Sequence, residues 1–380
     1  MKLLCSTSEF LQAIQLVSRA IGGQQALPIL GNILLQAKGE SCTVSATDLE
    51  ISIVTQFAAK IESEGAITIP AKAILNFAQY NNDAEVMLEA KDGTHLKCSS
   101  QHAKTVIAGS PASEYPTISQ VEKQTSFTLK ADPLLHALHL VTFAAAKTTL
   151  RPVLSGVYLR SVGNELILVA TDSYRLSEFR LPVDGGGVEV SCIIPAKILE
   201  ELKMILGSQK SDKKAKGDGE SGMTVQVSLS RQQIELEVGT TRLVSRLIDG
   251  KFPNYEQIIP AETSTKVYFP HGDLLTAAKR LHYFAKEMNN TLLFHCAQQS
   301  RISTPQTQAG QDEATIQAEL TGDENKIALS SSYLLDFLGH ISVDGVVMSI
   351  KDSQRPAVFR LPDEKNFLHL IMPLRMPAES

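Results

Sequence analysis

The chain repeats itself, and this repeat constrains the fold more than any local motif does. An Ala-Thr-Asp triplet followed by Pro-Ala-Lys occurs at residues 46–72 and again at residues 170–197. The copies are offset by 124 residues at the Thr-Asp pairs and by 125 at the Pro-Ala-Lys triplets. Tyr115 and Phe252, each followed by proline, form a second duplicated pair at an offset of 137. A period of about 125 predicts three structural units in the 380 residues.

The third copy is fainter, and two polar segments lengthen the later units. Residues 327–337 resemble the segment around Pro195, but no Thr-Asp pair precedes them. Residues 208–222 and 300–314 are polar and contain Gly, Ser or Pro, which predicts solvated loops inserted into units two and three. The predicted domains are 1–125, 126–261 and 262–380.

Each predicted unit contains one pair of helices among strands. Short alternations of apolar and polar residues, as at 51–54 and 224–229, predict strands. Longer stretches carry an apolar stripe at helical spacing, with neutral or basic residues on the other face. We therefore predict an α+β fold of three repeated domains, each with two helices packed on antiparallel sheets. The predicted helices are 8–21, 71–80, 132–146, 196–206, 273–288 and 332–338.

The composition indicates a globular chain without a membrane segment. The chain is 43% hydrophobic, and no apolar run approaches the ~20 residues of a membrane span. The five cysteines are scattered without a C-x-x-C pair, which predicts reduced thiols and a cytoplasmic protein. The net charge is −5, so a nucleic-acid surface would have to be local. Basic residues do recur on or just after the predicted helices: Arg19, Lys72, Lys147, Lys197, Lys203, Lys279, Arg280 and Lys286.

No motif for catalysis or cofactor binding is found, so we predict no catalytic residue, no metal and no cofactor. His136 and His139 are three residues apart, but no third ligand is near them in the sequence, which favours packing or solvated histidines. Asp48 and Asp172 leave two interpretations open. A repeat-built oligomeric hydrolase would use them as acids, whereas a repeated turn would use them to bond backbone amides. The turn is favoured, since the third unit lacks the acid.

Five separated motifs occur in an order that is similar to one known family. They are LPILGN at 27–32, TDLE at 47–50, ATDSYRL at 170–176, LIDGKFPNY at 247–255 and IMPLRM at 371–376. Together they resemble the bacterial DNA polymerase III beta subunit, the sliding-clamp family, from residue 1 to about residue 376.

The resemblance implies a non-enzymatic processivity factor that closes as a head-to-tail homodimeric ring around double-stranded DNA. Helices would line the hole and sheets would form the outer wall, so that DNA contacts are independent of sequence. The implied partners are the replicative DNA polymerase catalytic subunit, the clamp loader and other proteins with clamp-binding motifs, without a membrane partner.

The resemblance also implies which residues contact DNA. This chain departs from the family at two of these places. Gly22-Gly23 is followed by Gln24, where members often carry a basic residue, and Pro152 stands where some members carry an aromatic. The implied DNA contacts are Gln24, Lys72, Lys147, Thr148, Arg151 and Lys197.

A partner-peptide cleft between the second and third domains is implied as well. A surface rich in Met and Leu suits several partners, because Met repacks around different anchors. Without the family match, residues 369–374 would be interpreted as a buried last strand. The implied cleft residues are Leu154, Thr171, Ser173, Tyr174, Arg175, Leu176, Pro253, Gln257, Ile258, Pro356, Leu370, Ile371, Met372, Pro373, Leu374, Arg375 and Met376.

For the dimer interface, the resemblance points to Thr105 and Ile107 on a strand at 105–108. This strand would meet Phe284 and the strand at 292–297 of the other chain. A third interpretation, a monomeric scaffold that only binds peptides, also stays open, and light scattering would separate it from the ring.

Overall fold

The computed structural model describes residues 1–22, 27–118, 120–148, 150–183, 189–216 and 222–376, with side chains at these positions except 209–216. The chain divides into two compact units. Unit 1 comprises Met1–Asp132 and Met204–Leu247, and unit 2 comprises Pro133–Lys203 and Ile248–Ser380. Within the described residues, no helix combines the length and hydropathy that a membrane span requires.

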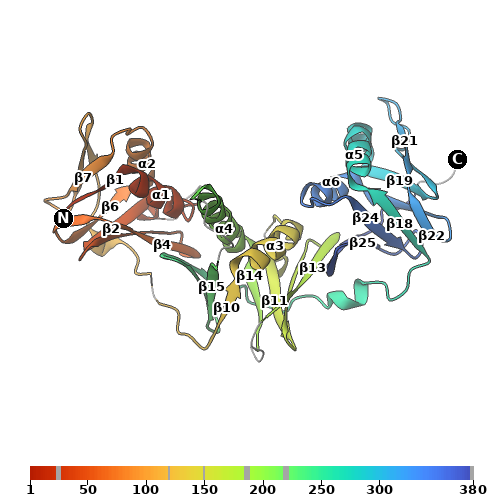
Figure 1. Ribbon diagram of the computed structural model, residues 1–380, viewed down its shortest axis with the longest axis horizontal. Helices are drawn as coiled ribbons and strands as arrows, with labels where there is room; N and C mark the ends of the chain where they lie inside the picture. The colour runs from red at the N-terminus through yellow and green to blue at the C-terminus, as the bar shows by residue number, and fades with distance from the viewer. Residues whose placement is uncertain (23–26, 119, 149, 184–188, 217–221, 377–380) are drawn as a thin grey trace. The chain divides into compact units, whose positions relative to one another are not determined.

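Unit 1 contains two antiparallel sheets and the helices α1 (Thr7–Ser18) and α2 (Ala71–Gln79), which contact each other (Figure 1). One sheet has the strand order β5-β1-β7-β8-β9, and the other has β10-β15-β16-β17-β4-β3-β2-β6. The strands are β1 (Lys2–Ser6), β2 (Asn32–Lys38), β3 (Ser41–Thr47), β4 (Ile51–Ala58), β5 (Lys60–Ser63), β6 (Gly65–Pro70), β7 (Glu85–Glu89), β8 (His95–Ser99), β9 (Lys104–Ala108), β10 (Thr125–Lys130), β15 (Thr224–Leu229), β16 (Gln233–Val238) and β17 (Thr241–Arg246).

Unit 2 is built in the same way, with α3 (Ala131–Val141), α5 (His271–Ala285) and α6 (Ser331–Gly339) (Figure 1). Its larger sheet has the order β14-β11-β12-β13-β26-β25-β24-β18-β22, and the smaller has β21-β20-β19-β23. The strands are β11 (Gly156–Val162), β12 (Glu165–Thr171), β13 (Arg175–Pro182), β14 (Ser191–Pro195), β18 (Thr265–Pro270), β19 (Thr291–Cys296), β20 (Gln299–Ser303), β21 (Glu313–Gln317), β22 (Glu319–Gly322), β23 (Asn325–Ser330), β24 (Gly345–Ile350), β25 (Ala357–Leu361) and β26 (Glu364–Ile371).

A strand that runs directly into a helix is the repeated building block. This junction occurs six times in the described chain, at β1-α1, β6-α2, β10-α3, β14-α4, β18-α5 and β23-α6. Pro70, Pro195 and Pro270 stand at three of the junctions, with φ of −52° at Pro70 and −58° at Pro270. Proline is fixed near this φ and cannot donate to a sheet, so it suits the residue at which a strand ends and a helix begins. The junctions confirm the predicted α+β fold with two helices for each repeat.

The apolar pattern of the sequence decides which face each element buries. In β4, Ile51, Ile53 and Phe57 are buried and alternate with more exposed residues. In α1, Phe10 and Ile14 lie on the buried face. These two periods are the ones expected for a half-buried strand and an amphipathic helix.

The predictions for the two inserted segments are wrong in part. Helix α4 (Ala196–Lys216) continues through residues 208–216, because this stretch contains neither Gly nor Pro and includes helix-favouring Lys and Ala. Residues 300–314 are not one solvated loop either. Their ends belong to β20 and β21, which pair as a hairpin with Ser303 opposite Glu313.

Candidate functional site

The two Thr-Asp pairs make the same turn. The Thr47 hydroxyl donates to the Ile51 carbonyl at 3.0 Å, and Asp48 Oδ1 accepts the Ile51 N–H at 2.8 Å. In the second copy, the Thr171 hydroxyl donates to the Arg175 carbonyl at 2.6 Å, and Asp172 Oδ1 accepts the Arg175 N–H at 3.0 Å. The residue after each aspartate has a left-handed backbone, with φ of 76° at Leu49 and 81° at Ser173.

These turns favour the structural interpretation of both aspartates over the hydrolase. In each, Oδ1 accepts two backbone N–H groups, and Asp172 Oδ2 also accepts Arg175 Nε at 3.1 Å. No group of three or more His, Cys, Asp or Glu side chains that could hold a metal ion is found in the described part of the chain.

Arg175 ties the second turn to two helical segments. The guanidinium is buried and donates to Asp172, to Asp336 Oδ2 at 2.5 Å and to the Phe143 carbonyl at 2.9 Å. It also lies 5.0 Å from the centre of the Tyr333 ring. Loss of a buried charge with several partners leaves those partners unsatisfied. Arg175 therefore positions the turn and is not an open contact surface.

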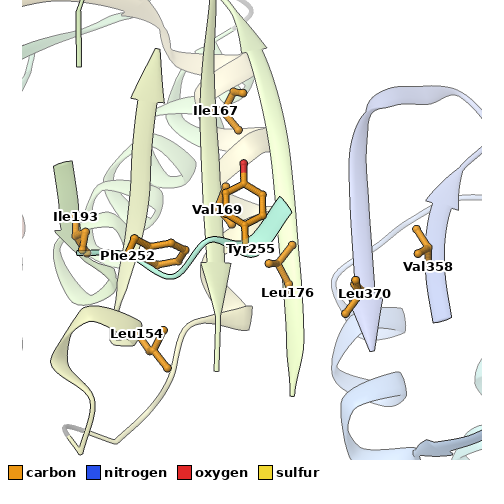
Figure 2. Packing of buried hydrophobic residues seen from close by; sticks show 9 residues of the cluster. All are labelled: Leu154, Ile167, Val169, Leu176, Ile193, Phe252, Tyr255, Val358 and Leu370. Atoms are coloured by element: carbon orange, nitrogen blue, oxygen red, sulfur yellow. The ribbon is translucent and has the colours of Figure 1, made fainter. Parts of the chain in front are cut away.

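Beside this turn lies an apolar cluster, shown in Figure 2. Leu176 on β13 and Leu370 on β26 stand opposite each other in paired strands. The cluster is completed by Leu154, Ile167, Val169, Ile193, Phe252, Tyr255 and Val358. It forms the buried floor under the exposed turn.

Four residues that lie near members of this cluster in the sequence, or that pack on it, form what we call the tail surface: Tyr174, Ile258, Met372 and Leu374. Met372 packs against the cluster, and its N–H donates to the Tyr174 carbonyl at 2.8 Å. Tyr174 is 61% exposed and Ile258 is 41% exposed, whereas Met372 and Leu374 are half-buried. Exposed apolar residues gathered over an ordered floor are typical of an interaction site.

The implied cleft residues therefore fall into a floor and a rim. The C-terminal run contains the later, mostly buried residues of β26, which ends at Ile371, and residues 372–376 continue beyond it. The cleft stays a prediction. The buried residues are Leu154, Thr171, Arg175, Leu176, Pro356, Leu370 and Ile371; the half-buried ones are Met372, Pro373, Leu374 and Met376; the exposed ones are Ser173, Tyr174, Pro253, Gln257, Ile258 and Arg375.

The residues implied in DNA contact are exposed wherever the structure describes them. Lys72 and Lys197 are the second residues of α2 and α4, directly after equivalent strand–helix junctions. Lys147, Thr148 and Arg151 lie between η3 (Thr142–Ala144) and η4 (Pro152–Leu154). Gln24 lies outside the described residues.

Some of the recurring basic residues are paired with acids within their own unit. Arg280 Nε donates to Asp312 Oδ2 at 2.8 Å, and Lys203 Nζ lies 2.6 Å from Glu200 Oε2. The net attraction of the helix faces for phosphate is therefore smaller than the count of basic residues suggests.

Two of the implied dimer residues lie on an edge strand of a smaller sheet and the third lies in a helix, with one correction to the prediction. Thr105 is exposed and Ile107 is buried on β9, the last strand of its sheet, and Phe284 is half-buried in α5. The strand at 292–297 corresponds to β19, which pairs with both β20 and β23. It has no free edge, so that part of the prediction is wrong. Two further strands from the 299–317 segment lie beyond it, and β21 is the outer one.

His369 is a buried residue that the motif search did not single out. Its Nδ1 lies 2.8 Å from Ser177 Oγ, and its ring stacks on Phe337 with centres 4.6 Å apart. Burial, reinforced by Arg175 and His340, holds the pKa of His369 well below its usual range. The available signal was the alternation of β26, which places His369 on the same face as the buried Phe367 and Ile371.

Unit 1 also contains a cavity of about 550 Å³ between α1, β4 and α4, with Arg19, Phe57 and Met204 in its lining. None of the predicted site residues contributes to this lining.

Together, the fold and the tail surface define a class: a protein of repeated modules, each a helix pair on antiparallel sheets, with an exposed apolar surface beside one module's turn. Models of the N-terminal, central and C-terminal domains of the DNA polymerase III beta subunit match residues 1–119, 128–254 and 256–375 in this order. The chain belongs to the DNA polymerase III beta subunit family, the bacterial sliding clamps, as the five motifs indicated.

Individual relatives match over nearly the whole chain. The beta sliding clamp of Synechocystis sp. is 28% identical over 99% of this chain and 100% of its own length. The crystal structure of the DNA polymerase sliding clamp from Bacillus subtilis is similar at a TM-score of 0.91 and 25% identity, covering 99% of this chain and 100% of that one. The DNA polymerase III beta subunit of Thermotoga maritima has a TM-score of 0.89 and 26% identity with the same coverage.

Proposed function

We propose that two copies of this chain close head to tail into a ring that encircles duplex DNA and confers processivity on the replicative DNA polymerase. The observation that carries this proposal is a strand–helix junction that occurs six times in the described chain. These junctions lie within three consecutive matches to the domains of the DNA polymerase III beta subunit. We also propose that the domains fall at 1–125, 126–261 and 262–380, and that the protein acts in the cytoplasm without a catalytic step of its own.

The proposed hold on DNA is topological. Exposed Lys72, Lys147 and Lys197, together with Thr148 and Arg151, would contact phosphates weakly and without regard to sequence. Each neutralised phosphate contributes a log–log salt slope of about −0.9. Contacts of this kind permit sliding, whereas enclosure prevents loss of the ring.

The proposed seam joins two sheet edges of different chains. An open edge is prone to pair with another strand, and a head-to-tail contact closes a ring when the rotation permits. Thr105 and Val106 on β9 are exposed, as are Glu313 and Thr315 on β21. We therefore propose that β9 of one chain pairs with β21 of the other, which takes the place of the strand at 292–297. Phe284 would lie near this seam.

The proposed docking site for the polymerase, the clamp loader and other partners is the tail surface with its rim. A short apolar peptide segment would cover Tyr174 and Met372 over the floor of Leu154, Leu176 and Leu370. Docking on a ring that cannot leave the DNA raises the effective concentration of the polymerase at its template.

The test compares closed and open DNA. The protein is assembled by its clamp loader on a nicked circular plasmid, half of which is then linearised, and both are passed over a sizing column at ~1 M salt, where the Debye length is about 3 Å. We expect the protein to stay with the circle and to leave the linear molecule, because enclosure is not electrostatic. Equal loss from both forms would sink the encirclement proposal.

A further inference from the structure

Unit 1 carries a second copy of the elements that build the tail surface. The Thr47 turn corresponds to the Thr171 turn, and η1 (Pro28–Gly31) corresponds to η4. Arg246, the last residue of β17, donates its N–H to the Glu50 carbonyl at 3.2 Å, as Met372 does to Tyr174 in unit 2. The repeat thus extends from the turn to the strand that flanks it.

The second copy also has exposed apolar residues. Leu27 is 51% exposed and Leu49 is 49% exposed. Leu49 holds a left-handed backbone, which is costly for a residue with a Cβ. Tyr115 connects the two segments, because its hydroxyl accepts the Thr47 N–H and donates to the Asn32 carbonyl, each at 3.1 Å.

The two chain segments joined by the Tyr115 hydroxyl limit the distance between Leu27 and Leu49, and so the length of this surface. Leu27 precedes η1, which ends at Asn32, and Leu49 is two residues from Thr47. At ~2 Å per residue from Leu27 to Asn32, about 6 Å for the two Tyr115 hydrogen bonds and ~3.5 Å per residue from Thr47 to Leu49, the two leucines lie within about 25 Å of each other. About seven extended residues cover this length.

Acidic residues outnumber basic ones at the Leu49 turn but not at the tail surface. Around the Leu49 turn lie the acids Asp48, Glu50 and Glu114 and one base, Arg246, with Glu50, Glu114 and Arg246 exposed. The equivalent positions in unit 2 are Asp172, Tyr174, Lys251 and Met372, and Arg175 pairs with both Asp172 and Asp336. Because Arg175 and Lys251 balance these two acids, a basic segment is attracted to the first surface and not to the second.

We propose that Leu27, Leu49 and the surrounding carboxylates form a second docking surface, which takes a short linear peptide with apolar anchors flanked by Lys or Arg. This proposal depends on the proposed function only in treating the tail surface as its peptide-binding counterpart. The two surfaces would let one chain engage two partner segments that differ in flanking charge.

The test uses three labelled peptides and fluorescence anisotropy. The first is Lys-Lys-Ile-Thr-Leu-Lys-Lys, the second has Glu in place of Lys, and the third keeps Lys but has Gly in place of Ile and Leu. The variants are Leu49→Gly, whose backbone suits φ of 76°, and Glu50→Lys at an exposed site. Ser173→Gly is the matched backbone control in the other turn, and Tyr174→Ala disables the tail surface.

We expect the Lys-flanked peptide to bind the unmodified protein and to lose about tenfold in affinity with Leu49→Gly or Glu50→Lys, since one buried leucine or one charge reversal is worth this much. Ser173→Gly and Tyr174→Ala should leave its affinity unchanged. The Glu-flanked peptide should bind more weakly than the Lys-flanked one, because the carboxylates around Leu49 repel it.

Four results would overturn the proposal: no binding of the Lys-flanked peptide, equal binding of the Gly-containing peptide, insensitivity to both Leu49→Gly and Glu50→Lys, or loss of binding with Tyr174→Ala. Failure of the ring would appear in the plasmid assay and not here. Failure of only the polymerase's clamp-binding peptide would contradict docking at the tail surface and leave the Leu49 surface standing.

Discussion

At the residue scale, Arg175 and His369 show how a few buried polar groups connect four elements. Arg175 lies on β13 and bonds Asp336 of α6 and the carbonyl of Phe143 in η3. His369 lies on β26, one strand over, and bonds Ser177 of β13. A buried, hydrogen-bonded polar group lies in a low-dielectric environment, where charges on neighbouring groups act on it more strongly than they would in water.

His369 gives a pH prediction. Its pKa in the folded protein is well below the 6.5 expected for the unfolded chain. Below about pH 6.5 the unfolded state therefore binds more protons, and the free energy of unfolding falls as pH falls, by up to about 1.4 kcal/mol per pH unit for one group. His369→Asn keeps a partner for Ser177 and should make this slope shallower. Urea unfolding from about pH 7.5 to about pH 5 measures both slopes.

His139 and His282 also have lowered pKa values, through burial first, and both remain in the variant. The difference between the two slopes therefore isolates His369. Identical slopes for the two proteins would show that His369 is not kept neutral by the fold.

At the element scale, strand edges decide where chains can join. An alternation of apolar and polar residues predicts that a strand has a buried and an exposed face, but it does not predict which strands lie beside it. The strand at 292–297 was predicted as an interface strand and is an interior one, whereas β21 begins at the end of the segment 300–314 that was predicted as a loop. An antiparallel pair of β9 and β21 must keep its core residues on one face, so Ile107 has to oppose Ala314 or Ile316.

These two registers make a crosslinking prediction. With Ile107 opposite Ala314, Val106 faces Thr315; with Ile107 opposite Ile316, Val106 faces Gln317. Directly opposed Cβ atoms are ~5 Å apart, close enough for a disulfide after small shifts. Val106→Cys combined with Thr315→Cys or with Gln317→Cys should give an oxidant-dependent dimer band in one combination. Each single variant is the control, and a dimer band from neither pair contradicts the proposed seam.

At the scale of the whole molecule, ring closure and partner docking are assigned to different segments. The proposed seam uses β9 and β21, while the tail surface depends on residues beyond β26. The tail is attached locally, through Met372 to the Tyr174 carbonyl and through Leu374 to the Ala328 carbonyl at 2.8 Å each. Functions carried by separate segments can be removed one at a time.

Deleting Met372–Met376 tests this separation. We expect the dimer, which is about 83 kDa for two undeleted chains of 41.3 kDa, to persist in light scattering at a slightly lower mass, because no seam residue is removed. Binding of the polymerase's clamp-binding peptide should be lost, since the apolar rim over the Leu370 floor is gone. A monomer would link the tail to the seam, and unchanged peptide affinity would contradict the tail-surface assignment.

The sequence by itself determined what depends on near neighbours. The Thr-Asp turns, the helix pairs and the repeat were predictable because hydrogen bonds within five residues and apolar periodicity act locally. The family was also predictable, because each of the five motifs lies in one short segment and can be recognised there. The tertiary structure decided what depends on distant strands: that β19 is interior, that β21 is an edge, that Arg175 is buried and paired, and that His369 is enclosed by Phe337. Whether a residue is buried, or a strand lies at an edge, depends on the segments that the fold places beside it. The residue's own stretch of sequence does not show which segments those are.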